Sequence, residues 1–202
     1  MMFINFVHQK HVLRPALKRI DVADGTVWIA NDQGAVAARG VDRRTAEREF
    51  VRLLLCNILQ DEVVEVAYQP AGQPCLPKFP HLYISISHSA HWYAIYISEA
   101  KPVGVDIQVP RQAILKGVDY FLNEVERQDK QRMADLDSLH KMWGAKEAFY
   151  KLLGGAEQEP EKAFTIREIE QASSGRIMLA YAGKQYVLHA EKHEEYYLVY
   201  TL

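Results

Sequence analysis

Two stretches of this chain place apolar residues at helical spacing, and segments with strand-like alternation follow each of them. The first helix is predicted over residues 43–60 and the second over residues 139–153, with a glycine pair directly after its end. Asp137 or Ser138 is expected to cap the start of the second helix. Strands are predicted over residues 82–87, 91–98, 103–109, 175–180, 185–190 and 196–201. Because no strand–helix–strand order repeats, we expect an α+β fold rather than a doubly wound sheet.

Composition excludes several classes of protein. Hydrophobic residues make up 49% of the 202 residues and charged residues 25%, as in ordinary globular proteins. The net charge of −2 argues against a surface that binds nucleic acid as a whole. No apolar run approaches the ~20 residues of a membrane-spanning helix, and the first residues lack the pattern of a signal peptide. We therefore expect a cytoplasmic protein without a membrane partner.

The two cysteines, Cys56 and Cys75, lack the spacing of metal ligands. Cys56 lies within an apolar run of the first predicted helix, which predicts a buried free thiol.

The second predicted helix carries charged residues on one face. Trp143, Glu147 and Lys151 are spaced four residues apart and therefore line the same side. Such a glutamate–lysine pair can be an ordinary surface ion pair, which contributes only ~0.3–0.5 kcal/mol. The tryptophan at the start of this face, and Lys146 near the adjoining apolar stripe, favour instead charges held at the edge of a cleft.

The strand predicted over residues 103–109 alternates cleanly, with its valines and isoleucine on one face and Asp106 on the other. Asp106 is costly there unless it is paired or bound to a cation, although an edge position would leave it simply solvated. Magnesium prefers oxygen ligands, usually one or two carboxylates completed by phosphates and water. Asp106 and Glu147, brought together by folding, would supply two carboxylates, and Gln108 on the same strand face would supply a neutral carbonyl.

The segment Ser87-His88-Ser89 lies where one predicted strand ends and the next begins. Backbone N–H groups, hydroxyls and an imidazole could hold a phosphate there, and a polar turn between two strands is an equally good interpretation. The chain has no G-x-S-x-G segment and no H-E-x-x-H pair, which argues against a serine hydrolase and a zinc site.

Taken in order, these segments resemble the 4′-phosphopantetheinyl transferases, specifically the larger, monomeric group of the surfactin-synthetase type. Gly104-Val105-Asp106-Ile107 is similar to the family segment G-[IV]-D-[IV]-E. Residues 143–151, which read W-G-A-K-E-A-F-Y-K, match the family segment W-x-x-K-E-[AS]-x-x-K at every defined position. The resemblance covers about residues 70–151, and four such segments in the right order and spacing are specific.

Single positions depart from the family pattern. Residues 86–89 and Trp92 match the family segment N-[IL]-S-H-S-x-x-W, but Ser85 stands where asparagine is usual. Gly72-Gln73-Pro74 stands where the family has G-K-P, so one lysine is missing. Gln108 replaces the usual acidic residue, so a metal site would lose one negative charge.

The resemblance implies a fold of two pseudo-symmetric α+β halves, each a small antiparallel sheet packed with helices, with the active site in the cleft between them. Residues 1–102 would form the half on the adenosine side of coenzyme A, and residues 103–202 the half with the metal and the catalytic helix. The implied reaction is Mg²⁺-dependent transfer of the 4′-phosphopantetheine moiety of coenzyme A to a serine of an apo acyl or peptidyl carrier protein. Adenosine 3′,5′-bisphosphate would be released, and a monomer would suffice.

The resemblance also implies roles for individual residues. Asp106 and Glu147 would ligate magnesium at the pyrophosphate, with Gln108 as a third ligand. Lys151 would contact the same phosphates, and Glu147, or a water that it orients, would take the proton of the carrier serine. The remaining contacts to coenzyme A would come from Ser87, His88, Gln73, Lys146, Arg44 and Arg52. The first two would hold the 3′-phosphate, helped by one of the arginines, and the Gln73 turn would lie against the adenine.

Other functions stay open. Gln108 and Gln73 favour a non-catalytic relative that binds coenzyme A or a carrier protein. A metal-dependent hydrolase of the coenzyme A pyrophosphate would use a further acidic cluster, which the sequence lacks. Basic residues in the range 111–132 could face an acidic carrier protein, and the acidic residues between them fit a solvated helix surface equally well.

Overall fold

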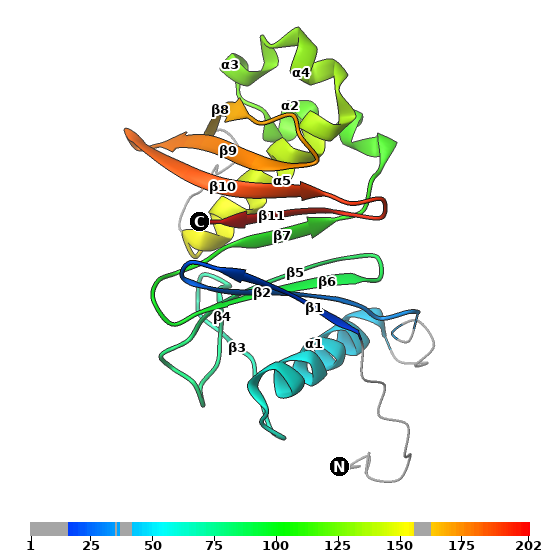
Figure 1. Cartoon of the computed structure of the whole chain (residues 1–202), viewed down its shortest axis with the longest axis vertical. Helices are drawn as coiled ribbons and strands as arrows, with labels where there is room; N and C mark the ends of the chain where they lie inside the picture. Colours follow the sequence, from blue (N-terminus) through cyan, green and yellow to red (C-terminus); the bar gives the residue numbers. More distant parts are fainter. Residues whose placement is uncertain (1–15, 35, 37–41, 156–162) are drawn as a thin grey trace.

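The computed structural model describes residues 16–34, 36, 42–155 and 163–202, and its first sheet belongs to the N-terminal half of the chain (Figure 1). This sheet is antiparallel, with the strand order β1-β2-β6-β5. Its strands are β1 (Leu17–Val22), β2 (Gly25–Asn31), β5 (Tyr83–Ser89) and β6 (Trp92–Ser98). Helix α1 (Arg43–Leu59) covers one face, because its buried apolar side chains pack against those of β2, β5 and β6. A ribbon of β3 (Ala67–Tyr68) and β4 (Pro74–Cys75) links α1 to β5.

The second sheet belongs to the C-terminal half and has the strand order β7-β11-β10-β9-β8. Its strands are β7 (Val105–Gln108), β8 (Thr165–Ile169), β9 (Ser174–Tyr181), β10 (Lys184–Lys192) and β11 (Tyr197–Thr201). Helix α5 (Leu136–Leu152) covers the face that points away from the first sheet. Between β7 and α5 the chain forms the short helices η3 (Gln112–Lys116), α2 (Val118–Phe121), α3 (Glu124–Arg127) and α4 (Lys130–Ala134).

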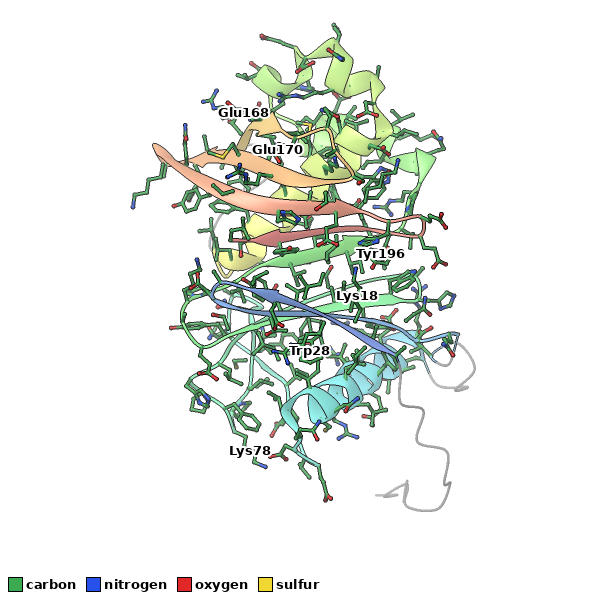
Figure 2. The ribbon with its side chains drawn as sticks, in the orientation of Figure 1. Lys18, Trp28, Lys78, Glu168, Glu170 and Tyr196 are labelled. Atoms are coloured by element: carbon green, nitrogen blue, oxygen red, sulfur yellow. The ribbon has the colours of Figure 1, made fainter. Side chains whose placement is uncertain are left out.

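The two sheets pack face to face, so the molecule has four layers: α1, the first sheet, the second sheet and α5 (Figure 1). Alternation along the strands explains this. On β7, Val105 and Ile107 join the apolar cluster between the sheets, which also contains Leu198 of β11. At the rim of that cluster, the ammonium of Lys18 on β1 lies 3.8 Å from the carboxylate of Glu191 on β10. Figure 2 shows Lys18 on the first sheet and Tyr196, directly before β11, on the facing side of the second sheet.

The halves repeat one arrangement of elements, as the expected pseudo-symmetry requires. In the first half, β2 is followed by α1 and then by the β5–β6 hairpin, and the spatial order is β2-β6-β5. In the second half, β7 is followed by α5 and then by the β10–β11 hairpin, and the spatial order is β7-β11-β10. The fold is therefore α+β with two similar halves.

Two local expectations are wrong. Helix α5 is capped by Asp135, not by Asp137 or Ser138, because the Asp135 carboxylate accepts hydrogen bonds from the backbone N–H groups of both of those residues. Cys56 is free but only half-buried, because it lies at the margin of α1 beside Arg52. None of the helices in the described ranges is long and apolar enough to cross a membrane.

Candidate active site

The predicted catalytic segments meet where β7 lies against α5, and two glycines allow the close approach. A Cβ atom on Gly104 would lie 1.8 Å from the carbonyl oxygen of Ala148. A Cβ atom on Gly144 would lie 2.7 Å from Val199 of β11 and 3.0 Å from Nε2 of Gln108. The helix face that holds positions 144, 148 and 151 is therefore the face that packs on β7. Half-buried Glu147 lies on this same side of the helix.

Asp106 is buried at this joint, with only 6% of its surface exposed. Its Oδ1 atom accepts hydrogen bonds from the Ser87 hydroxyl at 2.8 Å and from the Lys151 ammonium at 3.0 Å. Lys151 also donates to the backbone carbonyl of Val105 at 3.0 Å. The alternative of a simply solvated Asp106 is therefore wrong. Although β7 is the edge strand of its sheet, Asp106 is buried and its charge is compensated by a partly buried lysine.

Gln108 points to the same side of β7 and is also buried, with 5% of its surface exposed. Its Nε2 atom donates to the backbone carbonyl of His140 at 2.8 Å and lies 3.5 Å from Oδ2 of Asp106. Its Oε1 atom has no hydrogen-bond partner among the described residues. A buried carbonyl oxygen without a partner is unfavourable, so this atom is suited to a ligand that supplies positive charge.

These oxygen donors fit a magnesium ion. Asp106 offers a carboxylate and Gln108 the unpartnered amide oxygen, which matches the preference of this cation for oxygen ligands, and Glu147 carries a second carboxylate on the same side of α5. Within the described ranges no three His, Cys, Asp or Glu side chains are grouped so that they could hold a metal. That negative result is expected at this joint, because its third oxygen donor is an amide.

His140 supports Gln108 and was missed by sequence reasoning. Its Nδ1 atom faces the carbonyl oxygen of Leu136 at 2.8 Å, and its Nε2 atom accepts from the backbone N–H of Arg111 at 3.1 Å. The imidazole is therefore neutral, with its proton on Nδ1, and it stacks on Tyr197 at 4.5 Å. Burial and the nearby Arg111 lower the pKa of His140. Its position, inside an apolar helix run, gave no signal of this role.

Ser87 does not lie at a strand end but inside β5, with its side chain turned toward β7. Its hydroxyl accepts from the backbone N–H of Ile107 at 3.2 Å and donates to Asp106, and only 6% of the residue is exposed. This geometry does not support the expected contact between Ser87 and a 3′-phosphate, because the hydroxyl is directed into the joint between the halves.

His88 and Arg44 are placed differently from Ser87. His88 points from the opposite face of β5, with 41% of its side chain exposed, and its Nδ1 atom lies 3.8 Å from Glu47 of α1. Arg44 is exposed in the first turn of α1, one helical turn before Glu47. Arg52 is bound by Glu49 at 2.7 Å, so its guanidinium is already paired. His88 and Arg44 are thus the accessible members of the predicted phosphate contacts.

The turn before β4 reaches across to the second half. A Cβ atom on Gly154, directly after α5, would lie 3.0 Å from Oε1 of Gln73. A Cβ atom on Gly155 would lie 2.8 Å from the carbonyl oxygen of Ala71. Both glycines have positive φ angles, of 67° and 75°, which favour glycine. The predicted adenine turn therefore lies at the end of the helix that carries Lys151.

Lys146 lies apart from these residues. Its ammonium is 3% exposed, pairs with the carboxylate of Glu126 and donates to the carbonyl oxygen of Phe121. Glu126 in turn accepts from the backbone N–H groups of Asn123 and Ile166. The structure does not support the expected coenzyme A contact of Lys146, because this ion pair fastens the α2–α3 segment to α5.

The family model that matches this chain covers its C-terminal half. Residues 102–201 match the family model of the 4′-phosphopantetheinyl transferase superfamily. The 4′-phosphopantetheinyl transferase ffp of Bacillus subtilis is 30% identical over 130 residues, which are 57% of this chain and 58% of that protein. The 4′-phosphopantetheinyl transferase Sfp of Bacillus subtilis strain 168 is 28% identical over the same length and coverage. The 4′-phosphopantetheinyl transferase AcpT of Salmonella typhi is 30% identical over 131 residues, 60% of this chain and 65% of its own length.

Proposed function

This chain belongs to the 4′-phosphopantetheinyl transferase superfamily, and we propose that it transfers the 4′-phosphopantetheine arm of coenzyme A to a serine of an apo carrier protein. The observation that carries the proposal is the pair of buried Asp106 with partly buried Lys151, beside the unpartnered oxygen of Gln108 and inside the range that matches the family. The relatives are matched over 58–65% of their own length, so the activity is inferred for this chain and not transferred from them.

In this proposal the serine hydroxyl attacks the β-phosphorus of coenzyme A. A bond forms between the serine oxygen and that phosphorus, and the bond to the bridging oxygen of the pyrophosphate breaks. Adenosine 3′,5′-bisphosphate leaves with the bridging oxygen, and the Lys151 ammonium stabilises the charge that develops on it. Glu147 accepts the hydroxyl proton, directly or through a water that it orients.

A magnesium ion held by Asp106, Glu147 and Gln108 would supply charge neutralisation for the pyrophosphate oxygens. His88 and Arg44 would hold the 3′-phosphate, and the Gln73 turn would lie against the adenine. Residues 1–102 would thus serve the adenosine end and residues 103–202 the reacting end. We propose that the protein acts as a monomer, since both halves belong to one chain. We also propose that it acts in the cytoplasm.

Intact mass of a purified apo acyl carrier protein tests the activity. After incubation with this protein, coenzyme A and magnesium chloride, the carrier is expected to gain the mass of one phosphopantetheine arm. The gain should disappear with EDTA and with Asp106→Ala. A carrier whose serine is replaced by alanine is the matched control, and a gain on that carrier would contradict the proposed acceptor.

The Glu147→Gln variant tests the proposed base. The amide keeps the shape of the side chain but cannot take a proton, so turnover is expected to fall by about 10²-fold or more. Coenzyme A affinity, measured by calorimetry, should stay close to that of the unaltered protein. Near-normal turnover in Glu147→Gln would remove Glu147 from this role.

One observation favours a second function. Gln108 stands at the position of an acidic residue in the family segment and leaves the joint with one negative charge fewer. A relative that binds coenzyme A or a carrier protein without transferring anything would show coenzyme A binding but no mass gain on several unrelated carriers.

A further inference from the structure

Three serines on one face of β5 join the two halves of the molecule. Their hydroxyl oxygens accept hydrogen bonds from the backbone N–H groups of residues on and just after β7. The N···O distances are 3.1 Å, 3.2 Å and 3.1 Å. The pairs are Ser85 with Val105, Ser87 with Ile107, and Ser89 with Val109. Each pair is separated by 20 residues, so the two strands run the same way at this joint. Serine side chains thus satisfy the N–H groups of β7, an edge strand that has no backbone partner on this side among the described residues.

Ser87 differs from its two neighbours because it also donates to Oδ1 of Asp106, at 2.8 Å. A serine hydroxyl has one hydrogen to donate. The N–H of Ile107 fixes the position of the Ser87 oxygen, and the single hydrogen is directed at the carboxylate. Both residues are 6% exposed, so solvent contributes little competition for this bond.

The bond leaves the two oxygens of Asp106 in different situations. Oδ1 accepts from both Ser87 and Lys151, whereas Oδ2 faces Nε2 of Gln108 at the long distance of 3.5 Å. Oδ2 is therefore the oxygen that remains available beside the unpartnered Oε1 of Gln108.

We propose that Ser87 is a positioning residue, which orients the Asp106 carboxylate so that Oδ2 can ligate a divalent cation. Ser87 acts from the first half on a ligand in the second half, so the joint between the halves also sets the geometry of the metal site. Groups that hydrogen-bond to metal ligands typically change metal affinity 10- to 100-fold when they are removed. The inference rests on the proposed function, because it assigns Asp106 to a metal.

The experiment measures binding of Mn²⁺, as a spectroscopic substitute for Mg²⁺, to the full chain in the presence of coenzyme A. Free Mn²⁺ is quantified by electron paramagnetic resonance for the unaltered protein, Ser87→Ala and Ser85→Ala. Ser85→Ala is the matched control, because Ser85 is also buried, at 2% exposure, and accepts a hydrogen bond from a β7 N–H, with no bond to Asp106 among those of the described residues.

Both variants should lose stability in urea. Ser85→Ala removes one hydrogen bond from the joint, and Ser87→Ala should lose somewhat more because it removes two. Only Ser87→Ala should raise the Kd for Mn²⁺, by about 10-fold or more. Ser87→Thr, which keeps a hydroxyl, should restore most of the affinity. If Ser87→Ala does not fold, Ser87→Cys, with a weak donor of similar size, gives the same comparison.

Equal Kd values for Ser87→Ala and Ser85→Ala would overturn the proposal, as would the absence of measurable Mn²⁺ binding by the unaltered protein. A third result would also overturn it: weaker coenzyme A binding by Ser87→Ala in EDTA with an unchanged Mn²⁺ affinity, which would indicate direct contact with coenzyme A. Carrier modification is not part of the readout. If the protein binds Mn²⁺ as described but modifies no carrier, the result would contradict the proposed transfer reaction and would still support the role of Ser87.

Discussion

At the scale of single residues, the amide of Gln108 provides both a hydrogen-bond donor and an acceptor, which an ionised carboxylate could not do. Its Nε2 atom donates to the carbonyl oxygen of His140, and its Oε1 atom is left for a cation. In Gln108→Glu a carboxylate oxygen would face that carbonyl without a proton. The unfolding free energy in EDTA is therefore expected to fall by about 1–3 kcal/mol.

Magnesium and coenzyme A should stabilise Gln108→Glu more than they stabilise the unaltered protein, because the added charge lies beside the bound cation. Urea unfolding with and without magnesium chloride and coenzyme A measures both effects. Gln112→Glu, which adds the same charge at an exposed position of η3, is the control. Identical behaviour of the two variants would contradict the assigned orientation of the Gln108 amide.

Asp137 links the first turn of α5 to the second sheet, and its titration should appear in the stability of the protein. Burial alone would raise the pKa of Asp137, but hydrogen bonds from Lys192 and Tyr197 lower it below the usual 3.8. The unfolded state therefore binds more protons than the folded state below that pH. The stabilisation is complete well above pH 3.8 and is lost as the pH falls through the folded pKa.

The Asp137→Asn variant should be less stable than the unaltered protein at pH 7, by an amount on the order of 1 kcal/mol, because 36% of the side chain is exposed and solvent screens the ion pair. The difference should shrink as the pH falls from 5 toward 3. Urea unfolding at several pH values measures it. A difference that stays constant over this range would show that the carboxylate is not stabilised by these partners.

At the scale of the elements, the close packing of β7 on α5 decides whether the site forms. A side chain on Gly104 would overlap the carbonyl oxygen of Ala148, which belongs to the helix backbone and cannot rotate away. Gly104→Ala is therefore expected to destabilise the protein by about 3 kcal/mol and to reduce carrier modification with it. Thermal unfolding and the mass assay measure the two effects.

Gly117→Ala is the control for this prediction. Gly117 has a φ angle of −100°, and the nearest atom to an added Cβ would be 3.6 Å away. This substitution should change stability by no more than about 1 kcal/mol. Equal losses in the two variants would mean that the strand and helix can separate without cost.

Sequence patterns predicted the elements whose residue types alternate or recur at helical spacing. Helices α1 and α5 and the strands β5, β6, β7, β9, β10 and β11 follow from helical spacing or alternation. Strand β2 was missed because its apolar residues Val27–Ala30 follow one another directly, so no alternation is visible in the sequence. The helices α2, α3 and α4 were missed because four or five residues are too few for a helical pattern.

At the scale of the whole molecule, the sequence predicted which residues meet at the joint of β7 and α5 better than it predicted the partners of the others. Spacing on α5 and the aspartate in β7 identified Glu147, Lys151 and Asp106 as candidates. The roles expected for Ser87 and Lys146 found no support, because their partners come from elements 19 and 20 residues away in the chain. Only the packing of the two halves, and of the α2–α3 segment on α5, brings those pairs together.

The surface that would meet an acidic carrier protein also depends on the whole fold. In the segment from η3 to α4 (residues 112–134) Arg127 is paired with Asp119 at 2.9 Å and Arg132 with Asp129 at 3.1 Å. Lys116 and Lys130 are exposed, and neither forms an ion pair within the described part of the chain. The charges of these two lysines are therefore available to interact with an acidic carrier protein.

Association with an apo acyl carrier protein should slow as salt increases from low to physiological ionic strength, because screening weakens the attraction between separated charges. Replacing both Lys116 and Lys130 by glutamate should lower the association rate constant by about 10-fold at low salt and flatten its salt dependence. Arg127→Glu is the comparison, since its charge is already balanced by Asp119. Stopped-flow fluorescence with a labelled carrier measures these rates. A rate constant that does not change with salt in the unaltered protein would place the docking surface elsewhere.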